Sequence, residues 1–263
     1  MILKRKIYDD LVRWKNESNG STALLIDGAR RVGKSFVARQ FGENEYKSYI
    51  IIDFAVATHE IKDLFIYNTD DLNLFFQKLS LYYAVTLYDR ESLIVFDEVG
   101  QFPPARQFIK YLVADGRYDY LETGSLIRLK KNVQNIVIPS EEEHIEMFPL
   151  DFEEFLWALG DTTTVPILKS FFDKKMPLGE AIHRKIMNLF KQYMLVGGMP
   201  QSVLAYLPDK VLSVLTKLNV LSLIYTARML VNLLKDMKTK CLPFLIIFRP
   251  SYQKRQKNLR YLH

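Results

Sequence analysis

Residues 23–35 read ALLIDGARRVGKS, and most of the architecture can be inferred from them. The first five residues, ALLID, are typical of a short buried strand, and the amphipathic run FVARQF at 36–41 predicts a helix. Between them, Gly28, Gly33, Lys34 and Ser35 fit the spacing G-x-x-x-x-G-K-[ST] of a phosphate-binding loop, or Walker A motif. Strand, glycine-rich loop and helix, in this order, are the context that the motif requires.

The residue types of this loop suit an anion. Phosphates need several donors at close range, and backbone N–H groups supply them where side chains do not block the approach. The helix that begins near Lys34 directs the positive end of its dipole toward the same place. Lys34 adds a cation, and Ser35 offers a hydroxyl to Mg²⁺. We therefore expect one continuous loop to hold nucleotide phosphates: Gly28, Ala29, Arg30, Arg31, Val32, Gly33, Lys34 and Ser35.

A second motif lies 63 residues beyond Lys34, which leaves room for crossover connections between parallel strands. The apolar run SLIVF at 92–96 predicts a strand, and Asp97-Glu98 follows it directly. A carboxylate at that strand end, Asp97, can hold Mg²⁺ opposite Ser35. The next carboxylate, Glu98, is placed to polarise an attacking water as the catalytic base.

A third candidate group is the sequence TGS at 123–125, which follows a predicted strand over 118–123. A hydroxyl at that strand end would lie beside the terminal phosphate, so Thr123 and Ser125 are candidate nucleotide ligands. The alternative is an ordinary glycine turn whose hydroxyls are satisfied locally.

Other charged residues are interpreted as solvated. Arg106 and Lys110 lie one turn apart on a predicted helix over 102–113, where either could reach a phosphate but solvent is favoured. The run at 128–131 could supply a transition-state arginine, although a solvated charge run is favoured. His144 has no partner at metal-ligand spacing, which favours a surface histidine.

The remaining patterns predict a layered α/β fold. A docking helix is expected over 3–17, further strands over 49–54 and 144–150, helices over 57–89 with a break at 68–70, and a helix capped by Asp151. These elements predict a P-loop NTPase with a parallel sheet of about five strands flanked by helices, followed by a small, mainly helical C-terminal segment. We place the ATPase domain at 1–160, the helical segment at 161–223, and a separate tail at 224–263.

The amino-acid composition is that of a globular protein and argues against membrane-spanning and disulfide-rich classes. Hydrophobic residues make up 49% of the chain, which is ordinary for a globular protein, and no apolar run reaches the ~18 residues of a membrane span. The single cysteine, Cys241, excludes an internal disulfide framework and multi-cysteine metal sites. We expect a cytoplasmic protein without a membrane partner.

The motifs together resemble the AAA-type ATPases, specifically prokaryotic proteins that join a P-loop core to a C-terminal domain of uncharacterised function. The resemblance covers roughly residues 1–220 and rests on five segments: GARRVGKS at 28–35, LIVFDEVGQFP at 93–103, TGS at 123–125, MFPLDFEEFL at 147–156 and GGMP at 197–200. It implies ATP rather than GTP, a Mg²⁺ ion, and hydrolysis in which Glu98 activates water. In such proteins the C-terminal domain normally continues well beyond the length found here.

The last forty residues do not resemble that continuation. They carry nine lysines and arginines but one acidic residue, so the basic charge of the chain is concentrated in them. Codons permitted for 224–263 can encode, in a neighbouring register, an amphipathic sequence that resembles the expected continuation. We therefore hypothesise that a frameshift near Leu223 produced this tail and truncated the protein, which the coding DNA would settle. The alternative is a native basic segment that binds nucleic acid or a membrane.

The sequence thus predicts a Mg²⁺-dependent, ATP-hydrolysing switch that acts on an unknown protein partner, and oligomers are compatible with it. Two alternatives stay open: an ATP-binding interaction module with little turnover, and a truncated inactive product. A small-molecule phosphotransferase is disfavoured, because Asp97-Glu98 suits water activation and no acceptor pocket is evident in the sequence.

Overall fold

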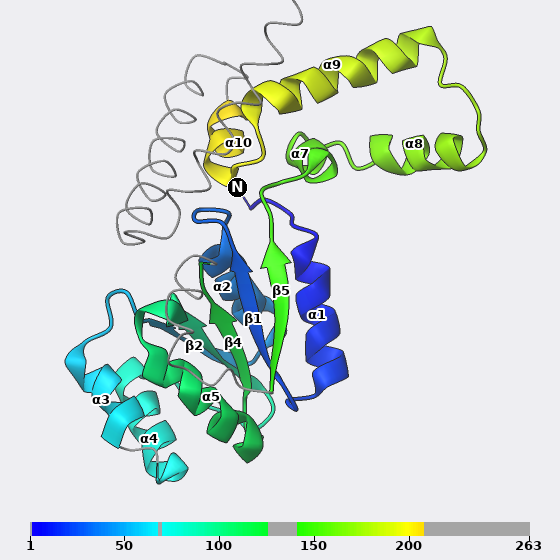
Figure 1. The fold of residues 1–263 in the computed structure, drawn as a ribbon. Helices are drawn as coiled ribbons and strands as arrows, with labels where there is room; N and C mark the ends of the chain where they lie inside the picture. The colour runs from blue at the N-terminus through cyan, green and yellow to red at the C-terminus, as the bar shows by residue number, and fades with distance from the viewer. Residues whose placement is uncertain (1, 68–69, 126–140, 208–263) are drawn as a thin grey trace, which may run out of the picture. The chain divides into compact units, whose positions relative to one another are not determined.

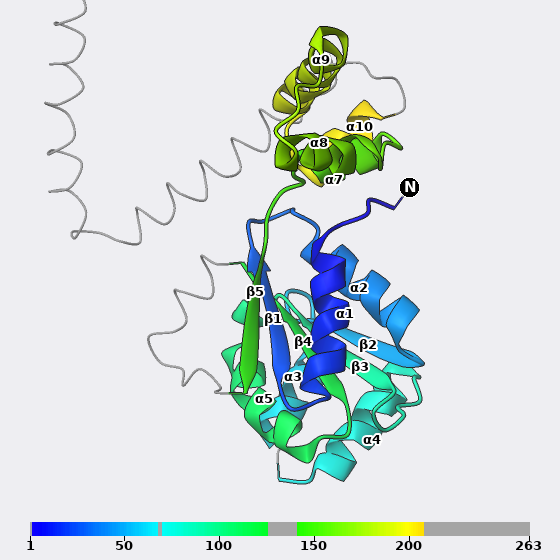
Figure 2. The same cartoon turned by 90° about the vertical axis from the view of Figure 1, so that its right-hand side faces the viewer.

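The computed structural model describes residues 2–67, 70–125 and 141–207 (Figures 1 and 2). Within these residues five strands form one sheet in the order β2-β3-β4-β1-β5. All neighbouring strands are parallel, which confirms the predicted α/β sheet. The strands are β1 (Ala23–Gly28), β2 (Ser48–Asp53), β3 (Ser92–Asp97), β4 (Asp119–Thr123) and β5 (Glu142–Met147).

Helices cover both faces of the sheet, because its strands carry apolar side chains on both faces. Alternate residues of β1 point to opposite faces, so Ala23 and Leu25 join one buried cluster, whereas Leu24 and Ile26 join the other. The first cluster packs against α3 (His59–Tyr67), α4 (Leu72–Tyr83) and α5 (Pro103–Asp115). The second packs against α1 (Ile7–Ser18) and α2 (Lys34–Glu45), on the other side of the sheet (Figure 2).

Two helix boundaries differ from those predicted. The helix expected over 3–17 begins at Ile7, so the segment before it, which includes the buried Leu3 and Arg5, is not helical. The helical run expected to reach residue 89 ends at Tyr83, because Ala84 adopts a left-handed conformation with φ of 52°. Part of the predicted break, residues 68–69, lies outside the described residues.

Beyond β5 the described chain is helical, as predicted. It contains α7 (Phe152–Ala158), α8 (Thr164–Asp173), α9 (Glu180–Val196) and α10 (Pro200–Tyr206). Asp151 caps α7 in a capping box: it accepts from the Glu154 N–H, and the Glu154 side chain accepts from the Asp151 N–H. None of the helices in the described ranges is long and apolar enough to cross a membrane.

The solvated position predicted for Arg106 is wrong. Its guanidinium is buried and forms a bidentate ion pair with Glu142, Nε to Oε2 at 3.0 Å and Nη2 to Oε1 at 2.6 Å. Helical spacing could not reveal this partner, which lies 36 residues away on β5. Lys110, by contrast, is exposed as predicted.

A second carboxylate, Glu122 on β4, lies fully buried beside this pair. Burial, followed by the negative charge of Glu142, raises its pKa well above the usual value, while Arg106 acts in the opposite direction. One guanidinium cannot neutralise two buried carboxylates, so burial favours the protonated form of Glu122 in the folded chain.

This predicts a specific pH dependence of stability. The pKa of Glu122 is higher in the folded chain than in the unfolded chain, where it is about 4.3. The Glu122 contribution to stability is therefore complete below that pH and is lost as pH rises toward the folded pKa. Replacing Glu122 with Gln removes this loss. We expect the Tm advantage of E122Q over the unaltered chain to grow between pH 5 and pH 8, as measured by thermal denaturation.

The control is Glu17→Gln, an isosteric change at an exposed position of α1. Its Tm difference from the unaltered chain should stay constant over the same pH range. An E122Q curve parallel to the E17Q curve would show that Glu122 is ionised in the folded chain.

Candidate functional site

The phosphate loop begins where β1 leaves the sheet. Gly28 pairs with Met147 of β5 and has a φ of 143°. A Cβ at this position would lie 2.2 Å from the Met147 carbonyl oxygen, so a larger residue would force the strands apart. Glycine is therefore required at Gly28 both by its backbone conformation and by the close approach of β5.

The loop ends at Gly33, which precedes the first turn of α2. Its φ of 104° again lies in the region that favours glycine, and Gly33 itself has no side chain with which to cap the helix. The N–H groups of the first turn are therefore available to an anion. A cavity of about 420 Å³ lies at this point, lined by the loop residues Arg31 and Gly33, by the first residues of α2, and by Glu98.

Lys34 folds back over its own loop. Its Nζ donates to the carbonyl oxygens of Gly28 at 3.1 Å and Ala29 at 3.0 Å, and the side chain is buried. Burial lowers the pKa of the Lys34 ammonium, whereas Glu98, Asp97 and, more weakly, Asp27 raise it. The ammonium is therefore held at the mouth of the loop, among carbonyls and carboxylates.

Two strand ends and the start of α2 bring their polar groups together beside Lys34. Ser35 Oγ donates to Asp97 Oδ1 at 2.8 Å, and Thr123 Oγ1 donates to the same oxygen. The Glu98 N–H donates to Thr123 Oγ1 at 3.1 Å. Residues from α2, β3 and β4 thus meet around one carboxylate oxygen, although the sequence separates Ser35 from Thr123 by nearly ninety positions.

The donor set fits a magnesium ion that also binds phosphate. A hydroxyl and a carboxylate are hard oxygen ligands, and their 2.8 Å separation allows both to face one cation. Among residues 2–67, 70–125 and 141–207, no group of three or more His, Cys, Asp or Glu side chains could hold a metal. Ser35 and Asp97 would therefore hold Mg²⁺ together with water and phosphate oxygens.

Glu98 has an unusual backbone for its residue type. Its φ of 53° is left-handed, and this turn directs the chain from β3 into the short helix η1 (Val99–Gln101). The Glu98 side chain is partly exposed and lines the same cavity as Lys34 and Ser35. A carboxylate in that place can act on a water near bound phosphate.

The other predicted residues occupy different environments. Arg30 and Arg31 are exposed on the loop, and Arg31 reaches the cavity. Ser125 is buried, and its Oγ has no hydrogen-bond partner among the residues that the structure describes. His144 has a half-exposed side chain whose Nε2 lies 2.9 Å from Asp27 Oδ2. The charge run at 128–131 lies outside the described residues, as does the tail at 224–263.

Several residues that line the cavity were not predicted from the sequence. Leu3 and Arg5 precede α1, and Pro200, Gln201 and Leu204 belong to α10, yet all of them line the cavity beside the loop. The GGMP segment gave a signal for Pro200 only through its resemblance to a family motif. No spacing rule connects Arg5 with the phosphate loop, which follows it by more than twenty residues.

The comparison with known proteins agrees with this geometry. The model of a family described as "AAA domain" matches residues 20–156, which is more than half of the chain and includes the phosphate loop, Asp97-Glu98 and the start of α7. No curated protein matches the chain. With a phosphate loop at the end of β1 in a five-stranded parallel sheet, this chain belongs to the AAA-type P-loop ATPase family, whose members have a nucleotide-binding, ATPase-like function.

Proposed function

We propose that this chain binds ATP with Mg²⁺, hydrolyses it, and uses the cycle as a switch on a protein partner. The observation that carries the proposal is the convergence of Lys34, Ser35, Asp97, Glu98 and Thr123 at one edge of the sheet. Together they supply four requirements of phosphoryl transfer to water: charge, metal ligation, water activation and contact with the terminal phosphate.

The lining of the cavity favours a nucleotide over inorganic phosphate as the ligand. Beside Lys34 and Ser35 it is lined by apolar side chains, including Leu3, Val37 and Leu204. These suit the flat apolar faces of a base, while the loop holds the phosphates. We assign the phosphate contacts to the backbone of 28–33 with Lys34, and the base to the apolar part of the cavity.

In the proposed reaction each residue has one role. Ser35 and Asp97 would hold Mg²⁺, which would supply positive charge to neutralise the phosphates. Glu98 orients the attacking water and accepts its proton, while Thr123 Oγ1, which accepts from the Glu98 N–H, stands beside the terminal phosphate. Lys34 exchanges its contacts with the loop carbonyls for phosphate oxygens.

The test separates binding from turnover. Lys34→Ala should abolish ATP binding, because the loop loses its buried cation. Glu98→Gln keeps the shape but removes the base, so turnover should fall by about 10²- to 10⁴-fold while the Kd for ATP stays within a few-fold of the unaltered value. Phosphate release and equilibrium nucleotide binding are the two measurements.

The matched control for E98Q is Glu91→Gln. Glu91 is an exposed glutamate just before β3, whereas Glu98 directly follows that strand. E91Q should retain full turnover. Binding without turnover in the unaltered chain would instead support the interaction-module alternative, and unchanged turnover in E98Q would remove Glu98 from the mechanism.

The metal role of Ser35 has its own test. Ser35→Ala removes a proposed ligand, so hydrolysis should need a higher Mg²⁺ concentration for half-maximal rate. Ser35→Thr keeps the hydroxyl and should follow the unaltered curve, because the motif accepts either residue. Superimposable Mg²⁺ titrations of S35A and the unaltered chain would contradict the assignment.

A further inference from the structure

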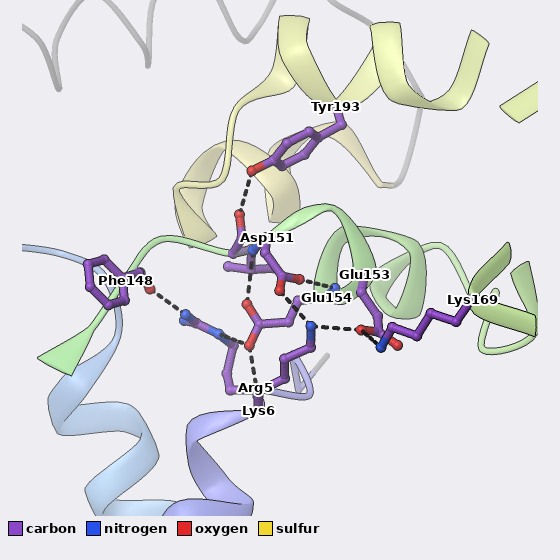
Figure 3. A network of polar contacts seen from close by, with 9 residues as sticks. Arg5, Lys6, Phe148, Asp151, Glu153, Glu154, Lys169 and Tyr193 are labelled. Carbon is purple, nitrogen blue, oxygen red and sulfur yellow. Dashed lines mark hydrogen bonds and ion pairs between the residues drawn. The ribbon is translucent and has the colours of Figure 1, made fainter. Parts of the chain in front are cut away.

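Arg5 joins three segments that are far apart in the sequence. From its place just before α1, its buried guanidinium donates from Nη1 to the Val32 carbonyl at 2.8 Å, from Nη2 to the Phe148 carbonyl at 2.6 Å, and from Nε to Glu154 Oε1 at 3.2 Å. Figure 3 shows it between the end of β5 and the first turn of α7. A guanidinium can make such divergent contacts because its donors point in several fixed directions.

The contact with Val32 acts on the phosphate loop directly. The Val32 carbonyl and the Gly33 N–H belong to one peptide unit, which is planar and trans, so the two groups point in opposite directions. Holding the carbonyl on Arg5 therefore sets the direction of the Gly33 N–H. Gly33 has no side chain to restrict its backbone, so an external anchor is needed to hold this peptide in one orientation.

Glu154 fixes Arg5 in turn. Its buried carboxylate accepts from three groups: Arg5 Nε, the Lys6 N–H at 2.7 Å and the Asp151 N–H at 3.0 Å. The last two lie at the starts of α1 and α7, where a negative charge is favourable. We therefore expect a change in the orientation of the Arg5 guanidinium to shift the Glu154 carboxylate, which lies in the first turn of α7.

The connection between β5 and α7 is also tied to the later helices. The Leu150 N–H donates to the Gly198 carbonyl at 2.7 Å, and Tyr193 Oη of α9 donates to the Leu150 carbonyl at 2.9 Å. The second of these contacts is visible in Figure 3. A Cβ on Gly198 would lie 2.2 Å from the Leu150 oxygen, so the two segments are in close backbone contact. A series of hydrogen bonds therefore connects the phosphate loop, through Arg5 and the connection between β5 and α7, to α9.

We propose that Arg5 is a positioning residue that aims the Gly33 N–H at the nucleotide phosphates and transmits nucleotide occupancy to the start of α7 through Glu154. The inference rests on the proposed nucleotide binding at the loop. It gives the N-terminal segment a part in the switch: nucleotide binding at the loop reaches the helices beyond β5 through Arg5.

The chain contains a reporter for this coupling. Trp157 of α7 lies against the same N-terminal segment, with Lys4 Nζ 4.9 Å and Lys6 Nζ 5.8 Å from its ring centroid. The other tryptophan, Trp14, packs on Phe41 in the core. In a Trp14→Phe background, ATP titration should change the emission of Trp157.

Arg5→Lys is the test variant. Lysine keeps the positive charge, but its three donors share one nitrogen, so they cannot reproduce the contacts that Arg5 makes from three separate nitrogens. R5K should bind ATP about tenfold more weakly, a loss of about 1.4 kcal/mol. It should also lose the Trp157 response even at saturating ATP, because the link from loop to α7 is broken.

The matched control is Arg106→Lys. Arg106 is equally buried, and its glutamate partner, Glu142, lies at the end of β5 remote from the loop. R106K should lower the Tm as R5K does, yet keep the ATP Kd and the Trp157 response. If folded R5K and R106K have equal Kd values for ATP and equal Trp157 responses, the proposed role of Arg5 is wrong, whereas the proposed nucleotide binding is not contradicted. Absence of nucleotide binding in both R106K and the unaltered chain would overturn the proposed function and this inference together.

Discussion

Parallel pairing of five strands is the constraint on which the site depends. Because all the strands run in one direction, their carboxyl ends lie at one edge of the sheet, and the loops that follow them share one region. Ser35, Asp97 and Thr123 come from three separate parts of the sequence and yet meet around one carboxylate oxygen. The insertion of β4 between β1 and β3 places Thr123 between the phosphate loop and Asp97-Glu98.

The second interaction of wide consequence is the buried Arg5–Glu154 ion pair. Burying two charges costs free energy, and the cost is offset only where the remaining donors and acceptors are satisfied. Here the guanidinium has two backbone carbonyls besides the carboxylate, and the carboxylate has two backbone N–H groups besides the guanidinium. A pair satisfied in this way connects backbone groups from separate segments, which suits the coupling proposed for Arg5.

Buried charge is used differently where Arg106 of α5 reaches the start of β5. There Arg106 and Glu142 form a pair, and Glu122 adds a third ionisable group whose pKa is raised by burial. The raised pKa of Glu122 makes the contribution of this cluster to folding stability fall as pH rises. The Arg5–Glu154 pair instead lies beside the candidate site. The contrast explains why two arginines of similar burial are expected to differ in their effect on nucleotide binding.

Local sequence was sufficient for the phosphate loop, four of the five strands, and the capping of α7 by Asp151, because glycine conformation, apolar runs and capping act over a few residues. The fifth strand, expected over 144–150, spans Glu142–Met147 instead. Local sequence also predicted a helical segment over 161–223, but large apolar side chains of α8 and α9 are exposed among the described residues, including Phe172, Ile182 and Met194. Periodicity identifies an apolar face without identifying what packs on it.

Long-range contacts produced what the sequence could not show: the strand order, the pairing of Arg106 with Glu142, and the contact of Arg5 with the phosphate loop. Each of these joins residues from separate elements, and no residue type or spacing identifies such a partner. The chemistry of the candidate site could therefore be inferred from residue types, whereas its support and its link to the later helices arise from which backbone carbonyls the fold brings within reach of one guanidinium.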